Sequence, residues 1–399
     1  MKKLMLLGGS RYLLPVIEKA HKLGLYVITC DYLPDNIAHK YSDEYLNISI
    51  IEKDAVLVAA QNASIDGIMS FACDPGVVTA AYVAEKMGLP FCGSYEAVSI
   101  LQNKGKFRAF LKENGFNVPE HGSYATEAEA LLELERFSFP VIVKPVDSAG
   151  SKGVMRADSV EELKKAIAFA LEYTHIGRFI IEEFIEKKGC SSDSDSFSDN
   201  GIFTYISFSD QRFDVNAKNP YTPAAYSWPP TMDEEMQVVL RNELQRLADL
   251  LELKTSIYNI ETRVGTNGKP YIMEVSPRGG GNRLAEMLEY ASDTDIISNA
   301  ILAAVGEPYQ TLNHPIYNGY WAEVILHSEK NGQFVSLEID EIIKNNVKEI
   351  DLWVKLGDFV DEFNGANNAI GTLVLRFSDK VKLEQTILNI YDYIKVIVE

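Results

Sequence analysis

Short apolar runs alternate with longer amphipathic segments over the first hundred residues. The runs at 4–7, 26–31 and 67–70 predict strands, whereas the segments at 13–23, 55–63 and 77–87 have the apolar spacing of helices. Alternation of strand and helix at this spacing is typical of a parallel sheet with right-handed crossovers. We therefore predict an α/β domain over residues 1–100.

The alternation is lost after residue 100, and the elements become less regular. We predict a second domain over residues 101–305, in which Asn103-Lys104-Gly105-Lys106 opens a helix that Gly115 closes. The other long amphipathic segment has the spacing of a structural helix. The predicted elements are helices at 107–114 and 234–251 and strands at 139–145, 179–185 and 202–208.

Two segments of the second part are harder to interpret. Residues 190–199 are rich in Ser and Asp, which fits either a linker or an antiparallel strand ahead of 202–208. Residues 216–230 hold four prolines and predict a loop over a site. The remaining residues, 306–399, read as a small α+β cap with strands at 320–326 and 370–377 and a helix at 381–393.

The glycines after the first predicted strand suggest a nucleotide fold. Gly8-Gly9-Ser10 follows that strand, and Asp31 ends the second one, as in a dinucleotide-binding domain. The full G-x-G-x-x-G motif is absent, so we do not predict a dinucleotide site.

Two carboxylates carry the clearest chemical signal. Glu261 and Glu274 lie in two short predicted strands joined by Asn267-Gly268, a dipeptide typical of hairpin turns. A hairpin brings the two side chains opposite each other, where they repel unless a cation lies between them. Hard oxygen ligands of this kind suit Mg2+ bound together with nucleotide phosphates. An ordinary hairpin with two exposed glutamates is the alternative.

A second signal lies upstream, where an apolar run ends in Lys144. The next stretch contains Ser148, Ala149, Gly150, Ser151, Lys152 and Gly153. Backbone N–H groups of such a loop can surround phosphate oxygens while the lysines neutralise charge. It is not a Walker A loop, because the required glycine and Gly-Lys-Ser/Thr spacing is missing. A plain turn between two strands is the alternative.

Composition narrows the classes of function. The net charge of −19 over 399 residues leaves no basic stripe for nucleic acid. The four cysteines are scattered, and they predict free thiols and no zinc site. No run reaches transmembrane length, and the N-terminal apolar stretch reads as a first strand and not a signal peptide. We therefore expect a cytoplasmic enzyme that contacts neither nucleic acid nor membrane.

The order of these motifs resembles that of the ATP-grasp superfamily over nearly the whole chain. Within it the chain is most similar to formate-dependent phosphoribosylglycinamide formyltransferase and related carboxylate–amine ligases, through residues 4–9, 142–146 and 274–278. The resemblance implies a mixed α/β and α+β architecture: an N-terminal parallel-sheet domain that binds no dinucleotide, an ATP-grasp fold over 101–305 and a C-terminal α+β domain.

The resemblance also implies the site residues for ATP and Mg2+, with Mn2+ as an alternative metal. Lys104, Lys144 and residues 148–153 would contact the phosphates, although Lys104 is otherwise only a helix-start lysine. Adenine would lie against Glu182, Glu183, Phe184 and Ile185, and the metal against Glu261 and Glu274. Relatives place an acid on the ribose where this chain has Cys190, so Asp193 or Asp195 are the alternatives.

The substrate contacts of the formyltransferase are not retained. That family has a basic pair before an Ile-Gly, whereas Asn368-Ala369 precede Ile370-Gly371 here, which removes the cations that bind a substrate phosphate. Arg11-Tyr12 and Gly281 also replace family residues. The same chemistry with a different substrate pair is therefore expected.

The resulting hypothesis is an ATP- and Mg-dependent carboxylate–amine ligase that works through an acyl phosphate and releases ADP and phosphate. Arg278 and Arg283 would contact the developing anions as catalytic residues. The partners would be a small carboxylate and a small amine, and a homodimer is compatible with the resemblance. A formyltransferase-type enzyme and a nucleotide-binding regulatory protein remain the alternatives.

Overall fold

The first hundred residues form the predicted α/β unit. The computed structural model describes residues 1–399 and contains a parallel sheet of order β3-β2-β1-β4, built from Lys3–Leu7 (β1), Tyr26–Cys30 (β2), Glu44–Leu46 (β3) and Gly67–Ser70 (β4). Helices α1 (Leu14–Lys22), α2 (Lys53–Ala63), α3 (Asp74–Met87) and α4 (Tyr95–Gln102) follow the strands. All predicted elements are confirmed. Strand β3 was missed because it is short and half-exposed.

The glycine after β1 has a packing role. A Cβ atom on Gly9 would lie 2.7 Å from Asn36 and from the imidazole of His39, which belongs to the 3-10 helix Ile37–Lys40. The close approach of two backbone segments therefore accounts for glycine at this position without a dinucleotide.

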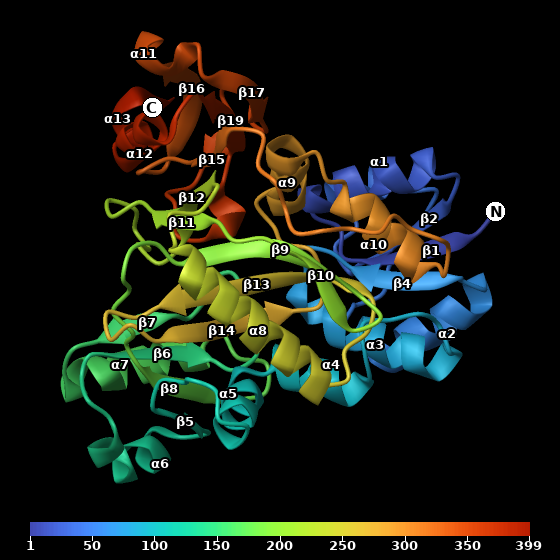
Figure 1. The fold of residues 1–399 in the computed structure, drawn as a ribbon, viewed down its shortest axis with the longest axis horizontal. Helices are drawn as coiled ribbons and strands as arrows, with labels where there is room; N and C mark the ends of the chain where they lie inside the picture. Colours follow the sequence, from blue (N-terminus) through green and yellow to red (C-terminus); the bar gives the residue numbers. More distant parts are fainter.

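A second lobe lies at the lower left of Figure 1. Its antiparallel sheet has the order β5-β8-β6-β7, from His121–Tyr124 (β5), Phe179–Glu183 (β8), Val141–Pro145 (β6) and Met155–Ala157 (β7). Helices α5 (Lys104–Glu113), α6 (Glu127–Leu132) and α7 (Val160–Leu171) accompany it, and a 3-10 turn spans Leu134–Arg136. Each helix starts at a side-chain cap: Asn103, Thr126 and Ser159.

The centre of the molecule is the antiparallel sheet β10-β9-β13-β14, covered by the long helix α8 (Glu234–Leu250) (Figure 1). Its strands are Ser192–Asp199 (β9), Ile202–Ile206 (β10), Ser256–Val264 (β13) and Pro270–Ser276 (β14). The strand interpretation of the Ser/Asp-rich segment is therefore confirmed. The alternation places Asp193, Asp195 and Phe197 on one face of β9 and the serines on the other.

The C-terminal part contains two sheets, of order β11-β12-β15-β19-β17 and β18-β16-β20. Their strands are Asp210–Phe213 (β11), Pro223–Trp228 (β12), Tyr320–Leu326 (β15), Gly332–Ile339 (β16), Val347–Leu352 (β17), Phe359–Val360 (β18), Gly371–Phe377 (β19) and Ile394–Val398 (β20). The helical segments are α11 (Glu341–Lys344), α12 (Lys380–Leu388), α13 (Ile390–Tyr393) and a 3-10 turn at Ala366–Asn368.

Two predictions in this region were wrong in detail. The segment 216–230 is only partly a loop, because β12 pairs with β15 and continues the sheet. The helix predicted at 381–393 is two helices that meet at Asn389, and the chain then returns as a strand. Prolines at both ends of β12 obscured the apolar run between them.

The largest hydrophobic core joins parts that are distant in sequence. Helices α9 (Leu284–Ser292) and α10 (Ile296–Ala304) bury Leu288 and Ile301 in one cluster with Leu6 of β1 and with Trp321 and Ile325 of β15. The predicted domain limits near 100 and 305 stay predictions. Hydrogen bonding crosses the second limit, since β11 and β12 belong to the C-terminal sheet.

Candidate active site

The predicted hairpin and its carboxylate pair are present. Strands β13 and β14 are antiparallel, and Glu261 lies opposite Glu274 in their register. The loop closes with Gly268 at φ +75°, which a residue with a side chain rarely adopts. Both glutamate side chains are 31% exposed, so they do not lie in a core.

The electrostatics of the pair are compatible with a cation ligand. Burial raises the pKa of Glu261; Arg263 opposes that rise and Glu274 adds to it. No third carboxylate, histidine or cysteine completes a metal cluster. Two carboxylates suit Mg2+, because this ion keeps several water and phosphate ligands and seldom has an all-protein cage.

Lys104 lies beside this pair. The side chain of Asn103 caps helix α5 by accepting a hydrogen bond from the N–H of Lys106, and this fixes Lys104 in the first turn. Its Nζ lies 3.3 Å from Oε2 of Glu274 and donates to the carbonyl of Ser148 at 2.9 Å. Burial alone would lower the pKa of Lys104, but the charges of Glu274 and Asp74 outweigh it and raise that pKa.

Lys144 leaves the end of β6 and belongs to a buried charge cluster. Its Nζ is 2.6 Å from Oε2 of Glu182, and the Arg108 guanidinium is 2.6 Å from Oε1 of the same carboxylate. Although burial opposes ionisation, Arg108 and Lys144 lower the pKa of Glu182 to about 2. Burial lowers the pKa of Lys144 despite Glu182. Glu182, predicted beside adenine, is thus positioned between two cations, and the sequence analysis missed Arg108.

The phosphate loop, residues 148–153, has unused hydrogen-bond donors. None of its six backbone N–H groups donates a hydrogen bond within the protein. Gly150, Ser151 and Gly153 have positive φ, a geometry that can turn successive N–H groups toward one anion. The Ser151 hydroxyl donates to the carbonyl of Tyr221. Two residues before Tyr221, the side chain of Asn219 donates to the carbonyl of Asn364.

The predicted adenine segment continues from β8 into a linker. The N–H of Phe184 is already used by the carbonyl of Pro140, and the Ile185 carbonyl accepts from Arg263 at 3.2 Å. The N–H of Ile185 has no partner in the protein, so it is the free backbone donor of this segment. Glu183 accepts from the N–H of Ser138 and thereby holds the linker in place.

Arg278 is held by a residue that the sequence analysis missed. Its Nε and Nη2 donate to the two carboxylate oxygens of Asp74 at 2.9 and 2.8 Å, and Ser276 donates to the same carboxylate. Burial opposes ionisation, yet Arg278 lowers the pKa of Asp74 below its ordinary value. Asp74 begins α3 just beyond the carboxyl end of β4, where ligands usually bind in parallel sheets. That position was the available signal.

Arg283 lies at the start of α9 and faces the C-terminal sheet. It contacts Glu286 at 3.1 Å, Glu349 at 2.7 Å and the hydroxyl of Thr372 at 3.1 Å. Both Asn282 and Arg283 have positive φ, which is costly for residues with side chains and is often found at functional sites. The charge of Arg283 is therefore shared between Glu286 and Glu349, and its contact with a substrate anion stays a prediction.

A chain of hydrogen bonds runs from Tyr12 through the C-terminal sheet to Asp193, beside the carboxylate pair. Tyr12 donates to Asn282, Asn282 donates to the hydroxyl of Tyr226, and Tyr226 donates to Asp193, with distances of 3.1, 3.2 and 3.1 Å. Asp193 lies opposite Glu261 in the register of β9 and β13. These residues continue the site from the carboxylate pair toward the third part of the chain.

Asp193 and Asp195 were considered as ribose contacts, and the structure does not favour either. Asp195 accepts from the N–H of Gly280 and, at 3.1 Å, from the amide of Asn259, which also donates to Asp193. Burial raises the pKa of both carboxyls to about 7. Both side chains are therefore engaged next to the Gly279–Gly281 loop, on the side of Arg278, and a ribose ligand in place of Cys190 is not identified.

The predicted substrate region contains an aromatic contact. The Arg11 guanidinium lies 5.4 Å from the Trp353 ring centre, and Tyr12 meets the same ring edge-to-face at 6.0 Å. Asn368 and Ala369 lie at the end of the 3-10 turn, and Asn368 accepts from the N–H of Asn364. The first and third parts of the chain therefore meet at this region.

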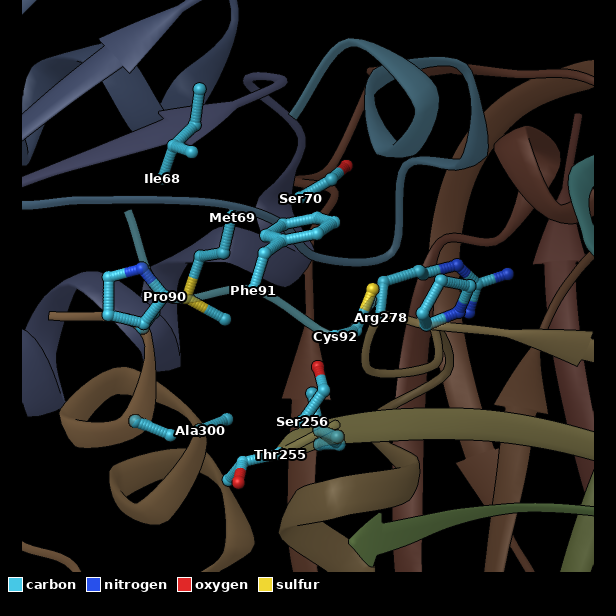
Figure 2. Close-up of a pocket in the computed structure, with 14 residues that line it drawn as sticks. Ile68, Met69, Ser70, Pro90, Phe91, Cys92, Thr255, Ser256, Arg278 and Ala300 are labelled. Atoms are coloured by element: carbon cyan, nitrogen blue, oxygen red, sulfur yellow. The ribbon is translucent and has the colours of Figure 1, made fainter. Parts of the chain in front are cut away.

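A small pocket lies beside Arg278 (Figure 2). Met69, Phe91 and Ala300 line it, and Arg278 is the only predicted site residue at its edge. The carboxylate pair and the lysines do not border it, so the charged groups and not this pocket define the candidate site.

The fold and these motifs together define a class of protein. Residues 137–286 match the family model of the ATP-grasp domain. The chain therefore contains an ATP-grasp domain, and the resemblance inferred from its sequence is confirmed.

Solved structures with the same fold cover the entire chain. The L-amino acid ligase from Bacillus licheniformis aligns with a TM-score of 0.82 at 21% identity, covering 100% of this chain and 99% of that one. The phosphoribosylglycinamide synthetase from Anaerococcus prevotii aligns with a TM-score of 0.76 at 21% identity over 100% of both chains. At these identities the likeness shows the fold.

Curated relatives match over part of their length. The carbamoyl phosphate synthase large chain of Thermoanaerobacter sp. (strain X514) is 25% identical over 246 residues, 60% of this chain and 22% of that protein. The C-terminal section of the same enzyme in Aquifex aeolicus (strain VF5) is 23% identical over 257 residues, 64% of this chain and 47% of that protein. The chain thus spans less than half of these relatives. No helix has both the length and the apolar character to cross a membrane.

Proposed function

We propose that this protein is an ATP- and Mg-dependent carboxylate–amine ligase. The observation that carries the proposal is the arrangement around Glu274. This carboxylate lies opposite Glu261 and 3.3 Å from the Lys104 ammonium, four residues before the anchored Arg278. Paired carboxylates on one hairpin, with a lysine and a fixed guanidinium nearby, are suited to holding a metal–phosphate group beside an anionic substrate.

The binding roles follow from the contacts. Glu261 and Glu274 would hold Mg2+, or Mn2+ as an alternative, while Lys104, Lys144 and the free N–H groups of the phosphate loop would hold the phosphates. Glu182 positions Lys144 through its 2.6 Å ion pair. The free N–H of Ile185 would bind adenine, with Glu183 fixing the linker through Ser138.

Bound ATP would supply the phosphoryl group: a substrate carboxylate oxygen bonds to the γ-phosphorus as ADP leaves, and the amine nitrogen then bonds to the acyl carbon as phosphate leaves. Arg278 would stabilise the anion at the acyl group by hydrogen bonds, and Asp74 keeps it in that orientation. Arg283, which is paired with Glu286 and Glu349, would act as a second contact for the substrate anion. One proton of the attacking amine passes to solvent.

The formyltransferase alternative lacks a phosphate site in the third part. Asn368 and Ala369 carry no charge, and the nearby Lys218 is paired with Glu362 at 2.8 Å. We therefore expect formate plus phosphoribosylglycinamide to cause no ADP release and no formylated product. A purely regulatory role is disfavoured because both glutamates and Arg278 are in place.

The test is ADP release from the whole protein with Mg2+, screened against pooled carboxylates and amines. ADP release that requires one member of each pool, with mass spectrometry showing the amide, supports a ligase. Glu274→Gln should abolish turnover and leave the fold intact, because this carboxylate is partly exposed beside a like charge. Glu235→Gln, an exposed glutamate on α8, is the matched control. Nucleotide binding without turnover against any pool would instead favour the regulatory alternative.

A further inference from the structure

One buried carboxylate has no partner in the protein. Glu323 is 0% exposed, and neither of its carboxylate oxygens accepts a hydrogen bond. It is the single charged residue of β15, whose other positions are apolar or aromatic. An isolated buried carboxylate is costly, so its presence in the centre of a sheet requires a compensating role.

The side chain of Glu323 faces helix α9, on the side of the sheet where Arg283 lies. Its neighbours two positions away on β15, Trp321 and Ile325, belong to the core shared with α9, whereas Ala322 and Val324 belong to the core on the opposite face. Because strand side chains alternate, Glu323 points toward α9. In the sheet register it lies beside Tyr226, the central member of the hydrogen-bond chain to Asp193.

The charges around Glu323 do not balance. Glu286 and Glu349 flank Arg283, which bonds to both of them and not to Glu323. Three carboxylates therefore share one guanidinium in a region closed on one side by Tyr12 and Asn282. Burial, more than any neighbouring charge, raises the pKa of Glu323 well above its ordinary value, so its carboxyl is neutral in the ligand-free protein and a bound cation would favour the ionised form.

We propose that Glu323 binds the ammonium group of a zwitterionic amino acid whose carboxylate is the group activated at Arg278. This inference rests on the proposed function and names its substrate class. An ammonium beside Glu323 would supply a donor and a positive charge. Tyr226, the neighbour of Glu323 in the sheet register, donates to Asp193, which lies beside Glu261 in the central sheet. Carboxylic acids without an amino group leave Glu323 unpaired and bind weakly.

The experiment compares the whole protein with its Glu323→Gln variant by calorimetry, in the presence of Mg2+ and a non-hydrolysable ATP analogue. The ligands are a panel of amino acids and the carboxylic acids that lack only the amino group. For the amino acids that bind the wild-type protein, Glu323→Gln should weaken affinity about ten- to hundredfold, the range of a buried charge-assisted hydrogen bond. Affinity for the amine-free acids should be unchanged. Glu338→Gln, an exposed residue of β16, is the control.

Thermal unfolding of the ligand-free proteins separates binding from a structural role. Because the Glu323 carboxyl is neutral without a ligand, the isosteric Glu323→Gln change should leave the unfolding midpoint nearly unchanged, whereas replacement of a residue required for folding should lower it. Equal affinity of both proteins for amino acids, or equal affinity of the wild type for amino acids and amine-free acids, would overturn the inference. The binding readout is independent of turnover, so a protein that binds amino acids through Glu323 and forms no amide refutes the ligase proposal alone.

Discussion

Replacing Asp74 with Asn should lower turnover, because Asp74 holds Arg278 in place. The change keeps the shape of the side chain and removes the charge that holds Arg278. Two hydrogen bonds, at 2.9 and 2.8 Å, join side chains that are only 16% and 8% exposed. Breaking one partner of such a buried pair costs about 3–5 kcal/mol. Asn retains one acceptor, so we expect about 3 kcal/mol, near the lower limit.

The loss should appear in turnover more than in nucleotide binding. Arg278 would remain charged, but its guanidinium would no longer be held in one orientation. A displacement of about 1 Å can lower the rate about a hundredfold. We therefore expect kcat for ADP release to fall by about two orders of magnitude while KM for ATP changes little. Asp35→Asn, an exposed aspartate of the same domain, is the control.

Urea unfolding provides the independent measurement. The variants Asp74→Asn, Arg278→Gln and their combination form a double-mutant cycle. If the two residues form one unit, the double variant should be less destabilised than the sum of the single ones, because no buried charge is left alone. Additive free energies together with normal kcat in Asp74→Asn would refute the anchoring role.

Three further predictions concern the nucleotide and pH. Lys144→Ala should weaken ATP binding about ten- to hundredfold by calorimetry, since it removes a charge-assisted contact; unchanged affinity would mean that β6 does not face the nucleotide. Hydrogen exchange over residues 147–154 should slow when an ATP analogue and Mg2+ are added, because the free N–H groups of the phosphate loop gain partners; equal exchange in both states would contradict that loop's role. The pKa values of Asp193 and Asp195 are about 7 in the folded protein, above the value of about 4 in the unfolded chain. The folded state therefore binds more protons between these values, and the free energy of unfolding should fall as pH rises from about 4 to about 7. Thermal unfolding of an Asp193→Asn, Asp195→Asn double variant across pH 5–8 should show a shallower slope than the wild type.

Local patterns predicted most of the elements and the pairing of the two carboxylates. The Asn267-Gly268 turn and the flanking strands suffice to place Glu261 opposite Glu274, because a hairpin is a local structure. The same holds for the capped helix that carries Lys104. The Ser/Asp-rich segment remained ambiguous because its apolar content is low, although its alternation was that of a strand.

The rest of the site depends on contacts between distant segments. Asp74 and Arg278 are 204 positions apart, and Tyr12 and Asn282 are 270 apart, so no local period reports them. Glu182 was placed beside adenine by resemblance, and its pairing with Arg108 on α5 shows only in the packing of α5 on β8. Glu323 did leave a signal, a lone charge in an apolar strand, which was not used.

The hydrogen bond from Ser151 to the Tyr221 carbonyl connects the nucleotide lobe with the chain segment that enters the C-terminal sheet. Asn219, two residues earlier, is bonded to Asn364 of that third part. A phosphate group that reorders the loop would therefore act on the hydrogen bond that joins this loop to the segment entering the C-terminal sheet. Thermodynamic reciprocity then requires equal effects in both directions. An amino compound bound at the C-terminal sheet must change the affinity for ATP by the same factor by which ATP changes the affinity for the amino compound. The expected consequence is that the dissociation constants of the two ligands depend on each other, which calorimetry of each ligand with and without the other would measure.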